Sequence, residues 1–388
     1  MKLSNRIDDV KPSATLSITS RAKSLVKEGE GVVIFAAGEP DFDTPKIVKE
    51  AAIKAIREGV TKYTPAGGTA TLKEAIVHKL SNDNDLKYSA DEVVISAGAK
   101  HSLYNLFQVI LDQGDEVLII HPYWLSYPEM VKLAGGVPRF LQTSRENGFK
   151  ARAEDIRSAL TEKTRAIIIN SPSNPAGVVY EKEELEEIAE VCLAEDVMVV
   201  SDEIYEKIIF GGKKHFSIAA VSDRLRERTV VVNGVSKSYA MTGWRIGYMA
   251  AQKDIVKAVT TLQSHSTSNP CSISQAAAEC ALKSDLDKLM NANRKEFEKR
   301  RDVLIENLSS EERIVPFKPS GAFYLFCDIS QFGMDSMTFS KKLLEEKQVA
   351  VIPGGPFGDD RYVRMSFATD LKTIKEGTRR IKDWTSKL

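Results

Sequence analysis

The chain has 388 residues, of which 43% are hydrophobic, and its 54 Lys and Arg residues balance 54 Asp and Glu residues. This length predicts two domains or one large α/β domain, and the zero net charge gives no electrostatic footprint for nucleic acid or an anionic membrane. The N-terminus lacks the apolar segment of a secretory signal, and no run approaches the ~18 apolar residues of a membrane helix. The four cysteines form no C-x-x-C pair. Free thiols in a reducing compartment are therefore favoured, and we expect a cytoplasmic protein.

The first 44 residues mix Pro and Gly punctuation, as in KPSAT and AAGEPDFDTP. From about residue 93 to 250, short apolar runs rich in β-branched residues alternate with helical patterns such as 153–160 and 183–195. Unbroken apolar runs are typical of strands buried on both faces, and their alternation with helices indicates βαβ units in a mostly parallel sheet. The runs are VVIS (93–96), EVLII (116–120), RAIII (165–169), VMVV (197–200), TVVVN (229–233) and GYMAA (247–251).

The C-terminal part has a different pattern. The charged stretch NRKEFEKRRDVLIENL predicts a long helix, GAFYLFCDI and YVRMSF predict strands, and a closing helix is expected toward Leu388. We therefore expect an α/β chain with a large domain, residues 45–290, and a smaller domain built from both termini, residues 1–44 and 291–388.

Ligands of parallel sheets bind beyond the carboxyl ends of the strands, so the polar residues after the apolar runs are candidates for a site. Lys237 follows the run TVVVN and lies near the small residues Gly234 and Ser236. Desolvation at such a strand end lowers the pKa of an ammonium and frees the amine for Schiff-base chemistry, whereas the alternative is a solvated surface charge. Arg245 suits a bidentate anion such as phosphate, or an internal salt bridge.

Asp202 closes the segment VMVVSD. A carboxylate at the end of an apolar strand needs a cationic partner, and the protonated pyridine nitrogen of pyridoxal 5′-phosphate (PLP) would serve. A helix N-cap or a structural ion pair is the alternative. Tyr205, three residues later, could belong to the core or donate its phenol to a cofactor oxygen.

Three further segments follow apolar runs. Asn174, in NSPSNPAG, is in a turn that could also place an amide over a bound ring. Trp124 could be packing or could stack on an aromatic ligand. Gly98, Ala99 and Lys100 precede a helical pattern, where backbone N–H groups can bind phosphate.

Motifs of other chemistries are missing from the sequence. There is no G-x-G-x-x-G, G-x-x-x-x-G-K-[ST], H-E-x-x-H or G-x-S-x-G, and five histidines make a histidine-based metal site unfavoured.

The segments SPSNPAG, SDEIY and SKSYAMTGWRIGY, in this order, resemble class I aminotransferases of PLP fold type I, and most closely the aspartate aminotransferases of subgroup Ib. The resemblance extends from KPSAT to YVRMSFAT. It implies a large domain with a mostly parallel sheet flanked by helices, a small α+β domain, and a homodimer with shared active sites. The implied reaction is ping-pong transamination between an amino acid and a 2-oxo acid. Aspartate or glutamate is the expected donor, and prephenate or aromatic acceptors stay open.

The same resemblance implies a role for individual residues. Lys237 binds PLP covalently and moves a proton between the substrate Cα and the cofactor, and Asp202 pairs with the pyridine nitrogen. Tyr205 and Asn174 hold the phenolic oxygen of the ring, and Trp124 stacks on the ring beside the substrate. The implied phosphate contacts are the backbone of Gly98, Ala99 and Lys100, the side chain of Arg245 and, from the neighbouring subunit, Tyr63. The implied contacts of the substrate α-carboxylate are Arg364, Gly38 and Asn174.

The strand pattern supports Arg364 independently. Alternation in YVRMSF places Arg364 with Tyr362 and Ser366 on one face, opposite Val363 and Met365, and an inward arginine suits a carboxylate. One departure concerns phosphate binding, because many relatives carry a serine three residues before the lysine, where this chain has Gly234. Either Ser236 partly compensates as a phosphate contact, or one phosphate contact is absent.

Lys100 is the expected reader of the distal carboxylate of a dicarboxylic substrate. In the other main subgroup an arginine of the neighbouring subunit does this, about thirty residues after the cofactor lysine. Here no Arg or Lys lies between Lys257 and Lys283. The alternative for Lys100 is a backbone-only phosphate contact with a solvated side chain.

Two other functions share these motifs. A PLP lyase also needs Lys237 and Asp202, but it releases ammonia or thiol without an amino acceptor. A non-catalytic sensor domain of a regulator would carry a DNA-binding segment ahead of this fold, and the resemblance here starts near residue 11.

Overall fold

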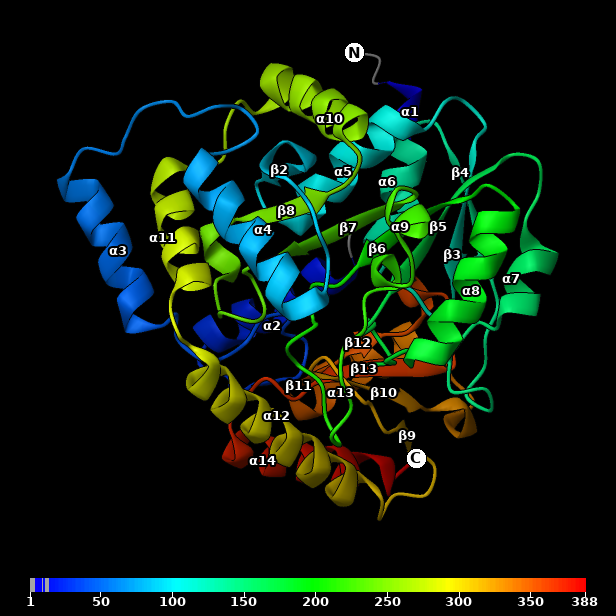
Figure 1. Cartoon of the computed structure of the whole chain (residues 1–388). Coiled ribbons are helices and arrows are strands. Elements are labelled where there is room, and N and C mark those ends of the chain that lie inside the picture. The colour runs from blue at the N-terminus through cyan, green and yellow to red at the C-terminus, as the bar shows by residue number, and fades with distance from the viewer. Residues whose placement is uncertain (1–3, 9, 11–13) are drawn as a thin grey trace.

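The computed structural model describes residues 4–8, 10 and 14–388. The remaining positions, which include the start of the KPSAT motif and part of the expected small-domain range 1–44, lie outside the described residues. The chain forms a seven-stranded sheet, a four-stranded sheet and a two-stranded sheet, with helices packed around them (Figure 1). No helix in the described part of the chain is long and apolar enough to cross a membrane.

The seven-stranded sheet contains all six strands expected from the apolar runs. Its order is β2-β8-β7-β6-β5-β3-β4, and only β8 runs antiparallel to its neighbours, so the expectation of a mostly parallel sheet is confirmed. The strands are β2 (Val93–Ser96), β3 (Glu116–Ile120), β4 (Val137–Leu141), β5 (Thr164–Asn170), β6 (Met198–Asp202), β7 (Thr229–Gly234) and β8 (Gly247–Ala250).

The edge strand β4 was not expected from the sequence. It contains Pro138 and Arg139, and none of its residues is buried. An edge strand tolerates proline and needs no apolar run, because one side of it has no partner. The apolar pattern that marks the central strands is therefore missing here.

Both faces of this sheet are buried by helices, as its β-branched composition requires. Ile168, Val200 and Val232 pack on one face against Leu106 and Val259 of the covering helices. The helices of the chain are α1 (Asn5–Asp8), α2 (Ala14–Lys27), α3 (Lys46–Arg57), α4 (Ala70–Asn84), α5 (Ala99–Ile110), α6 (Ser126–Leu133), α7 (Ala153–Ala159), α8 (Lys182–Ala194), α9 (Asp223–Arg226), α10 (Lys253–Ser266), α11 (Ser272–Lys283), α12 (Asp287–Leu308), α13 (Ser336–Lys347) and α14 (Leu371–Thr385).

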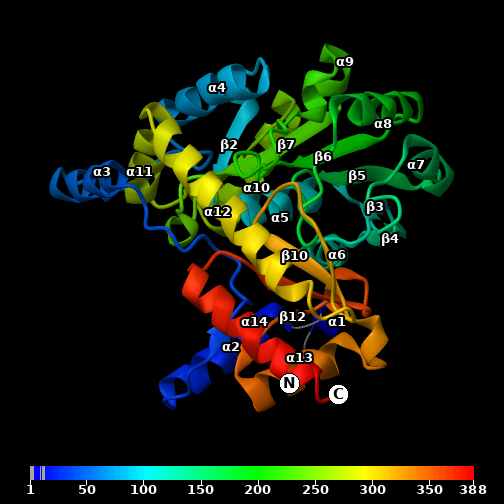
Figure 2. The ribbon, with the colours of Figure 1, turned by 90° about the horizontal axis from the view of Figure 1, so that it is seen from below.

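The C-terminal part forms the second layer, which lies apart from the large sheet in both views (Figures 1 and 2). Its antiparallel sheet has the order β12-β13-β10-β9, and the long charged helix, the two strands and the closing helix expected from the sequence are all present. Its strands are β9 (Val315–Phe317), β10 (Tyr324–Asp328), β12 (Ile352–Pro353) and β13 (Tyr362–Ser366).

The N-terminal segment joins this C-terminal layer. Strand β1 (Val33–Ile34) pairs in parallel with β11 (Val349–Ala350), and the backbone N–H of Ser366 donates to the carbonyl of Phe35. The segment that follows contacts the loop after β7, where Thr44 Oγ1 donates to the carbonyl of Ala240 and the Glu39 carboxylate accepts from Thr242 Oγ1. Part of the N-terminal segment is thereby placed beyond the carboxyl end of β7.

Candidate active site

A cavity of about 660 Å³ opens at the carboxyl ends of β6 and β7, between the two layers. It gathers side chains from segments that are far apart in the sequence. The expected site residues that line it are Gly38, Ala99, Lys100, Trp124, Asn174, Asp202, Tyr205, Ser236, Lys237, Arg245 and Arg364. The remaining two, Gly98 and Tyr63, do not line the cavity of this chain.

Lys237 lies three residues after the end of β7 and points across the cavity. Its Nζ donates a hydrogen bond of 2.6 Å to the carbonyl of Gly38. Burial lowers the pKa of Lys237 to about 8, while Glu39 opposes this shift and the positive charges of Arg364 and Arg245 add to it. The amine therefore needs little alkalinity to lose its proton and become a nucleophile or a base.

Asp202 ends β6 and is only 4% exposed. Its Oδ2 accepts a 2.6 Å hydrogen bond from the hydroxyl of Tyr127, and its Oδ1 accepts one from the backbone N–H of Ile204. The pKa of Asp202 is raised to about 6, mainly by burial, and the hydrogen bond from Tyr127 partly offsets this rise. The carboxylate is thus held in a fixed orientation, where a cationic ring nitrogen would stabilise its charge.

Tyr127 is the partner that the sequence reasoning missed. It lies three residues after Trp124, in the first turn of α6, and the two rings pack edge to face at 5.3 Å. This closeness in sequence is the one local signal that both residues serve the same site. The contact with Asp202 spans 75 positions in the chain, which no local pattern reveals.

Arg364 lies on β13 and is 2% exposed. Its Nη1 donates to Oδ1 of Asn174 at 2.9 Å, and its guanidinium lies 4.2 Å from the ring centroid of Tyr324. The Nε and Nη2 atoms are buried and have no hydrogen-bond partner among the described residues. Buried donors are nearly always paired, so the geometry calls for an anion that completes them.

Tyr205 and Asn174 line the same cavity as Asp202 and Arg364. The hydroxyl of Tyr205 is 3.0 Å from that of Tyr324, and burial raises the pKa of both phenols. Asn170, the first residue of the polar segment NSPSNPAG, donates from Nδ2 to the carbonyl of Asp202 and accepts from the backbone N–H of Asn174. It therefore holds the ends of two segments in register.

The opposite end of the cavity is built for an anion. Helix α5 begins directly after Gly98, whose φ of 94° is in the left-handed region. Arg245 closes over this turn, with Nη1 donating to the carbonyl of Thr242 at 2.8 Å and Nη2 donating to that of Ala97 at 3.3 Å. A Cβ atom on Gly98 would overlap Arg245 Nη2. Backbone N–H groups of α5 and a guanidinium therefore converge where a phosphate would bind.

Gly234 has a structural reason for lacking a side chain. A Cβ atom there would lie 2.9 Å from the Cα of Gly247 and 3.0 Å from the carbonyl of Ile246. The serine hydroxyl that many relatives have at this position would require these two strands to move apart. Ser236, which lines the cavity, is the hydroxyl nearest in sequence that remains.

Lys100 lies at the entrance to the same turn. Its Nζ is 4.8 Å from the centroid of the Trp124 ring, and it forms no hydrogen bond or ion pair with another described residue. Burial and the nearby charge of Arg245 lower the pKa of Lys100. A free ammonium in the wall of the cavity is suited to a negatively charged ligand group.

Tyr63 lies outside this cavity and its side chain is 91% exposed. The expected role of Tyr63 concerns the site of a neighbouring subunit, so its position on the surface of one chain leaves that role a prediction.

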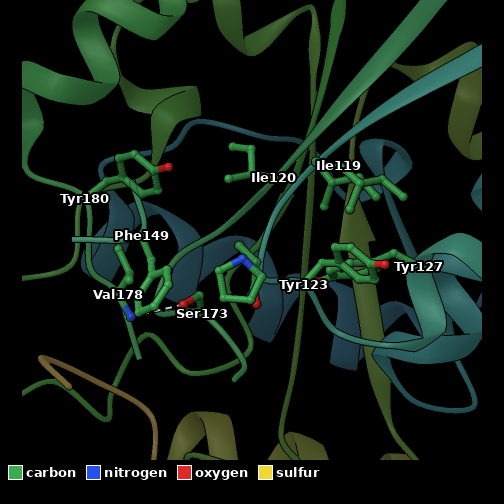
Figure 3. A pocket seen from close by; sticks show the side chains of 11 residues that line it. Ile119, Ile120, Tyr123, Tyr127, Phe149, Ser173, Val178 and Tyr180 are labelled. Atoms are coloured by element: carbon green, nitrogen blue, oxygen red, sulfur yellow. Dashed lines mark hydrogen bonds between the residues drawn. The ribbon is translucent and has the colours of Figure 1, made fainter. Parts of the chain in front are cut away.

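A second cavity, of about 30 Å³, shares part of its lining with the first (Figure 3). Tyr127 and Asn170 line both cavities, and Phe149, Val178 and Tyr180 close the far side. Its volume suffices for about one water molecule and excludes an organic substrate. The chemistry therefore belongs to the larger cavity.

Known proteins resemble this chain over almost its entire length. Residues 30–381 match the family described as aminotransferase class I and II. An aspartate aminotransferase of Bacillus subtilis (strain 168) is 50% identical over 100% of both chains, and a probable aspartate/prephenate aminotransferase of Aquifex aeolicus (strain VF5) is 46% identical over 98% of each. The solved aspartate aminotransferase from Thermus thermophilus with maleate has a TM-score of 0.95 at 42% identity and covers 99% of each chain.

Proposed function

The chain belongs to the class I and II aminotransferase family, and we propose from this premise that its cavity moves the amino group of aspartate or glutamate to a 2-oxo acid. Aspartate aminotransferases use pyridoxal 5′-phosphate, and the family match supports PLP-dependent transamination as the reaction. The observation that carries the assignment to this cavity is the convergence of three features. They are the lysine with the lowered pKa, the buried carboxylate and the anion-binding turn.

The residues present fit PLP from end to end. Gly98, Ala99, Ser236 and Arg245 would hold the phosphate, and Asp202 would pair with the ring nitrogen. Trp124 offers a flat face for the ring. When bound, the cofactor supplies an electron sink for the carbanion that forms at the substrate Cα.

Lys237 has two tasks in this proposal. Its amine, which is largely uncharged above a pH of about 8, would hold the cofactor covalently and would also accept and return the proton of the substrate Cα. The carbonyl of Gly38 orients the amine between these roles. Tyr205 and the Nδ2 group of Asn174 would donate to the phenolic oxygen of the ring, since Asn174 Oδ1 is already taken by Arg364.

Arg364 would bind the α-carboxylate of the substrate, helped by Gly38 and Asn174 at the cavity wall. The two unpartnered nitrogens of its guanidinium match the two oxygens of a carboxylate. Binding there fixes the substrate Cα relative to Lys237, which is what an orientation effect requires.

Lys100 would read the distal carboxylate of aspartate or glutamate. Its ammonium has no partner acid among the described residues and lies beside Trp124, on the cavity wall. Leu103, Leu125 and Ala37 line the same cavity, which leaves apolar surface for a bulkier acceptor. The aspartate/prephenate relatives make prephenate the second candidate acceptor.

We also propose a cytoplasmic homodimer with shared sites, divided into a large domain, residues 45–290, and a small domain, residues 1–44 and 291–388. The β1–β11 pairing supports the small domain, and all four cysteines are free, as in a reducing compartment. The exposed Tyr63 supports a contact that this chain makes outside itself.

Replacing Lys100 with Ala tests the substrate assignment. Loss of one partner of a buried charge pair costs about 2–5 kcal/mol. We therefore expect kcat/KM for aspartate to fall by roughly 30-fold to several-thousand-fold, and kcat/KM for alanine or phenylalanine to change little. Steady-state rates with a panel of donors against 2-oxoglutarate and oxaloacetate measure both. An equal loss for all donors would make Lys100 a cofactor residue and remove the argument for dicarboxylates.

A further inference from the structure

The segment that carries Tyr63, residues 58–69, joins α3 to α4 and passes over the top of α11 (Figure 1). Tyr63 itself is 91% exposed, yet the residues that follow it form hydrogen bonds with buried side chains of neighbouring helices. A connection without secondary structure of its own must find partners for its backbone groups elsewhere. Here two buried glutamine amides, Gln263 of α10 and Gln275 of α11, supply those partners.

Gln275 bridges the two ends of the turn. It is 1% exposed, and its Oε1 accepts a 2.8 Å hydrogen bond from the backbone N–H of Thr69. Its Nε2 donates to Oγ1 of Thr64 at 3.0 Å and to the carbonyl of Pro270 at 2.8 Å. Because Thr64 directly follows Tyr63, this single amide fixes the base from which the tyrosine projects.

Gln263 holds the middle of the segment and is fully buried. Its Nε2 donates to the carbonyls of Ala66 and Ile95, at 2.6 Å and 2.8 Å. Its Oε1 accepts from Ser96 Oγ and from Asn105 Nδ2. Ser96 ends β2, two residues before Gly98, so Gln263 also contacts the phosphate turn of its own chain. Gln275 has no such contact among the described residues.

We propose that Gln275 is a positioning residue for the cofactor site of the neighbouring subunit. It fixes the segment from which Tyr63 reaches the phosphate there, and the inference rests on the proposed shared-site homodimer. A flexible segment would have to be ordered when the cofactor binds, and that entropy would be lost from the affinity. Gln275 removes this cost in advance, and it does so for the partner subunit, because Tyr63 does not line the cavity of its own chain.

The test uses hybrid dimers in which only one site keeps Lys237. In the first hybrid, Gln275→Met is on the Lys237→Ala chain, so the working site receives Tyr63 from the altered chain. In the second hybrid, Gln275→Met is on the chain with Lys237, and Tyr63 of the working site comes from a chain with native Gln275. Both hybrids contain the same substitutions in different arrangement. The dissociation constant of PLP is measured by titrating the cofactor-free hybrids and following the absorbance of PLP bound to Lys237.

We expect the first hybrid to bind PLP about 10-fold more weakly than the second, because a hydrogen bond to a charged group is lost or loosened. Equal constants, or a loss confined to the second hybrid, would overturn the proposal. Gln263→Met should weaken PLP binding in both arrangements, since Gln263 contacts both the segment that carries Tyr63 and the phosphate turn of its own chain. Thr64→Val, which removes only the acceptor on the segment, should repeat the pattern of Gln275→Met with a smaller loss. It also keeps the test decisive if Gln275→Met does not fold.

Two control variants show whether a negative result contradicts only the role of Gln275 or also the proposed shared site. Tyr63→Phe in the arrangement of the first hybrid must itself weaken PLP binding. If it does and Gln275→Met does not, the positioning role alone is wrong, whereas no effect of Tyr63→Phe contradicts the shared site as well. Thr378→Val is the control for general destabilisation: it removes a hydroxyl from α14 at a residue that is 1% exposed, as Gln275 is. It should leave both dissociation constants unchanged, and a change would point to general destabilisation.

Discussion

The cavity contains a buried charged side chain at each of two ends: Asp202, which is 4% exposed, and Arg364, which is 2% exposed. The two side chains differ in how many of their polar atoms have a hydrogen-bond partner within the chain. Asp202 accepts from Tyr127 and Ile204. Arg364 donates only to Asn174 and keeps two nitrogens without a partner among the described residues. A group that stays bound through every cycle suits the first arrangement. A substrate that enters and leaves suits the second, because unpaired donors are satisfied only while it is bound.

The largest effect is expected from Asp202→Asn. The amide keeps the shape but cannot stabilise a protonated ring nitrogen, so the electron sink is weakened. We expect kcat to fall by several orders of magnitude, with the fold intact by circular dichroism. Single-turnover rates of the loaded variant check this, and an unchanged kcat would show that Asp202 is structural.

A smaller and different effect is expected from Arg364→Lys. The ammonium keeps the charge but lacks the planar fork that binds a carboxylate through two hydrogen bonds. We expect kcat/KM to fall roughly 30-fold or more for every amino acid donor, while the affinity for PLP stays near that of the native protein. If PLP affinity fell as strongly as kcat/KM, the contrast between the two ends would be lost.

The smallest effect is expected from Tyr127→Phe, and it depends on pH. Burial raises the pKa of Asp202 to about 6 and the Tyr127 hydroxyl lowers it, so removing that hydroxyl raises the pKa above about 6. As the pH falls, Asp202 therefore becomes protonated at a higher pH in the variant than in the native protein. We expect PLP binding to the cofactor-free protein to weaken below a pH of about 6 in the native protein, and at higher pH in the variant.

Titration of the PLP dissociation constant between pH 5 and pH 8.5 measures this shift. The two proteins should agree most closely at the alkaline end, where Asp202 is ionised in both. A difference of constant size at every pH would mean that Tyr127 contributes through packing on Trp124 alone.

The strands and the site residues could be predicted where a local pattern carries the information. The β-branched runs predicted β5, β6 and β7 because both faces of those strands are buried. Lys237 and Asp202 could be found because each lies within four residues of the end of such a run. Arg364 could be found because strand alternation separates it from Val363 and Met365, which pack in one apolar cluster.

The contacts that tune the site could not be predicted in this way. Tyr127 reaches Asp202, and Tyr324 reaches Tyr205, across 75 and 119 positions of the chain. Gln263 and Gln275 lie on helices whose sequence shows only that they are amphipathic. In each case the side chain acts through a tertiary contact, and its residue type would fit equally well on a solvated surface.

The most direct test of the account is to find where PLP attaches. The purified protein is reduced with borohydride, digested and analysed by mass spectrometry, with Lys237→Ala as the control. We expect the cofactor on the peptide that contains Lys237, and we expect the control to carry no label there and to have lost turnover by several orders of magnitude. Label on another lysine, or full activity of Lys237→Ala, would contradict this expectation.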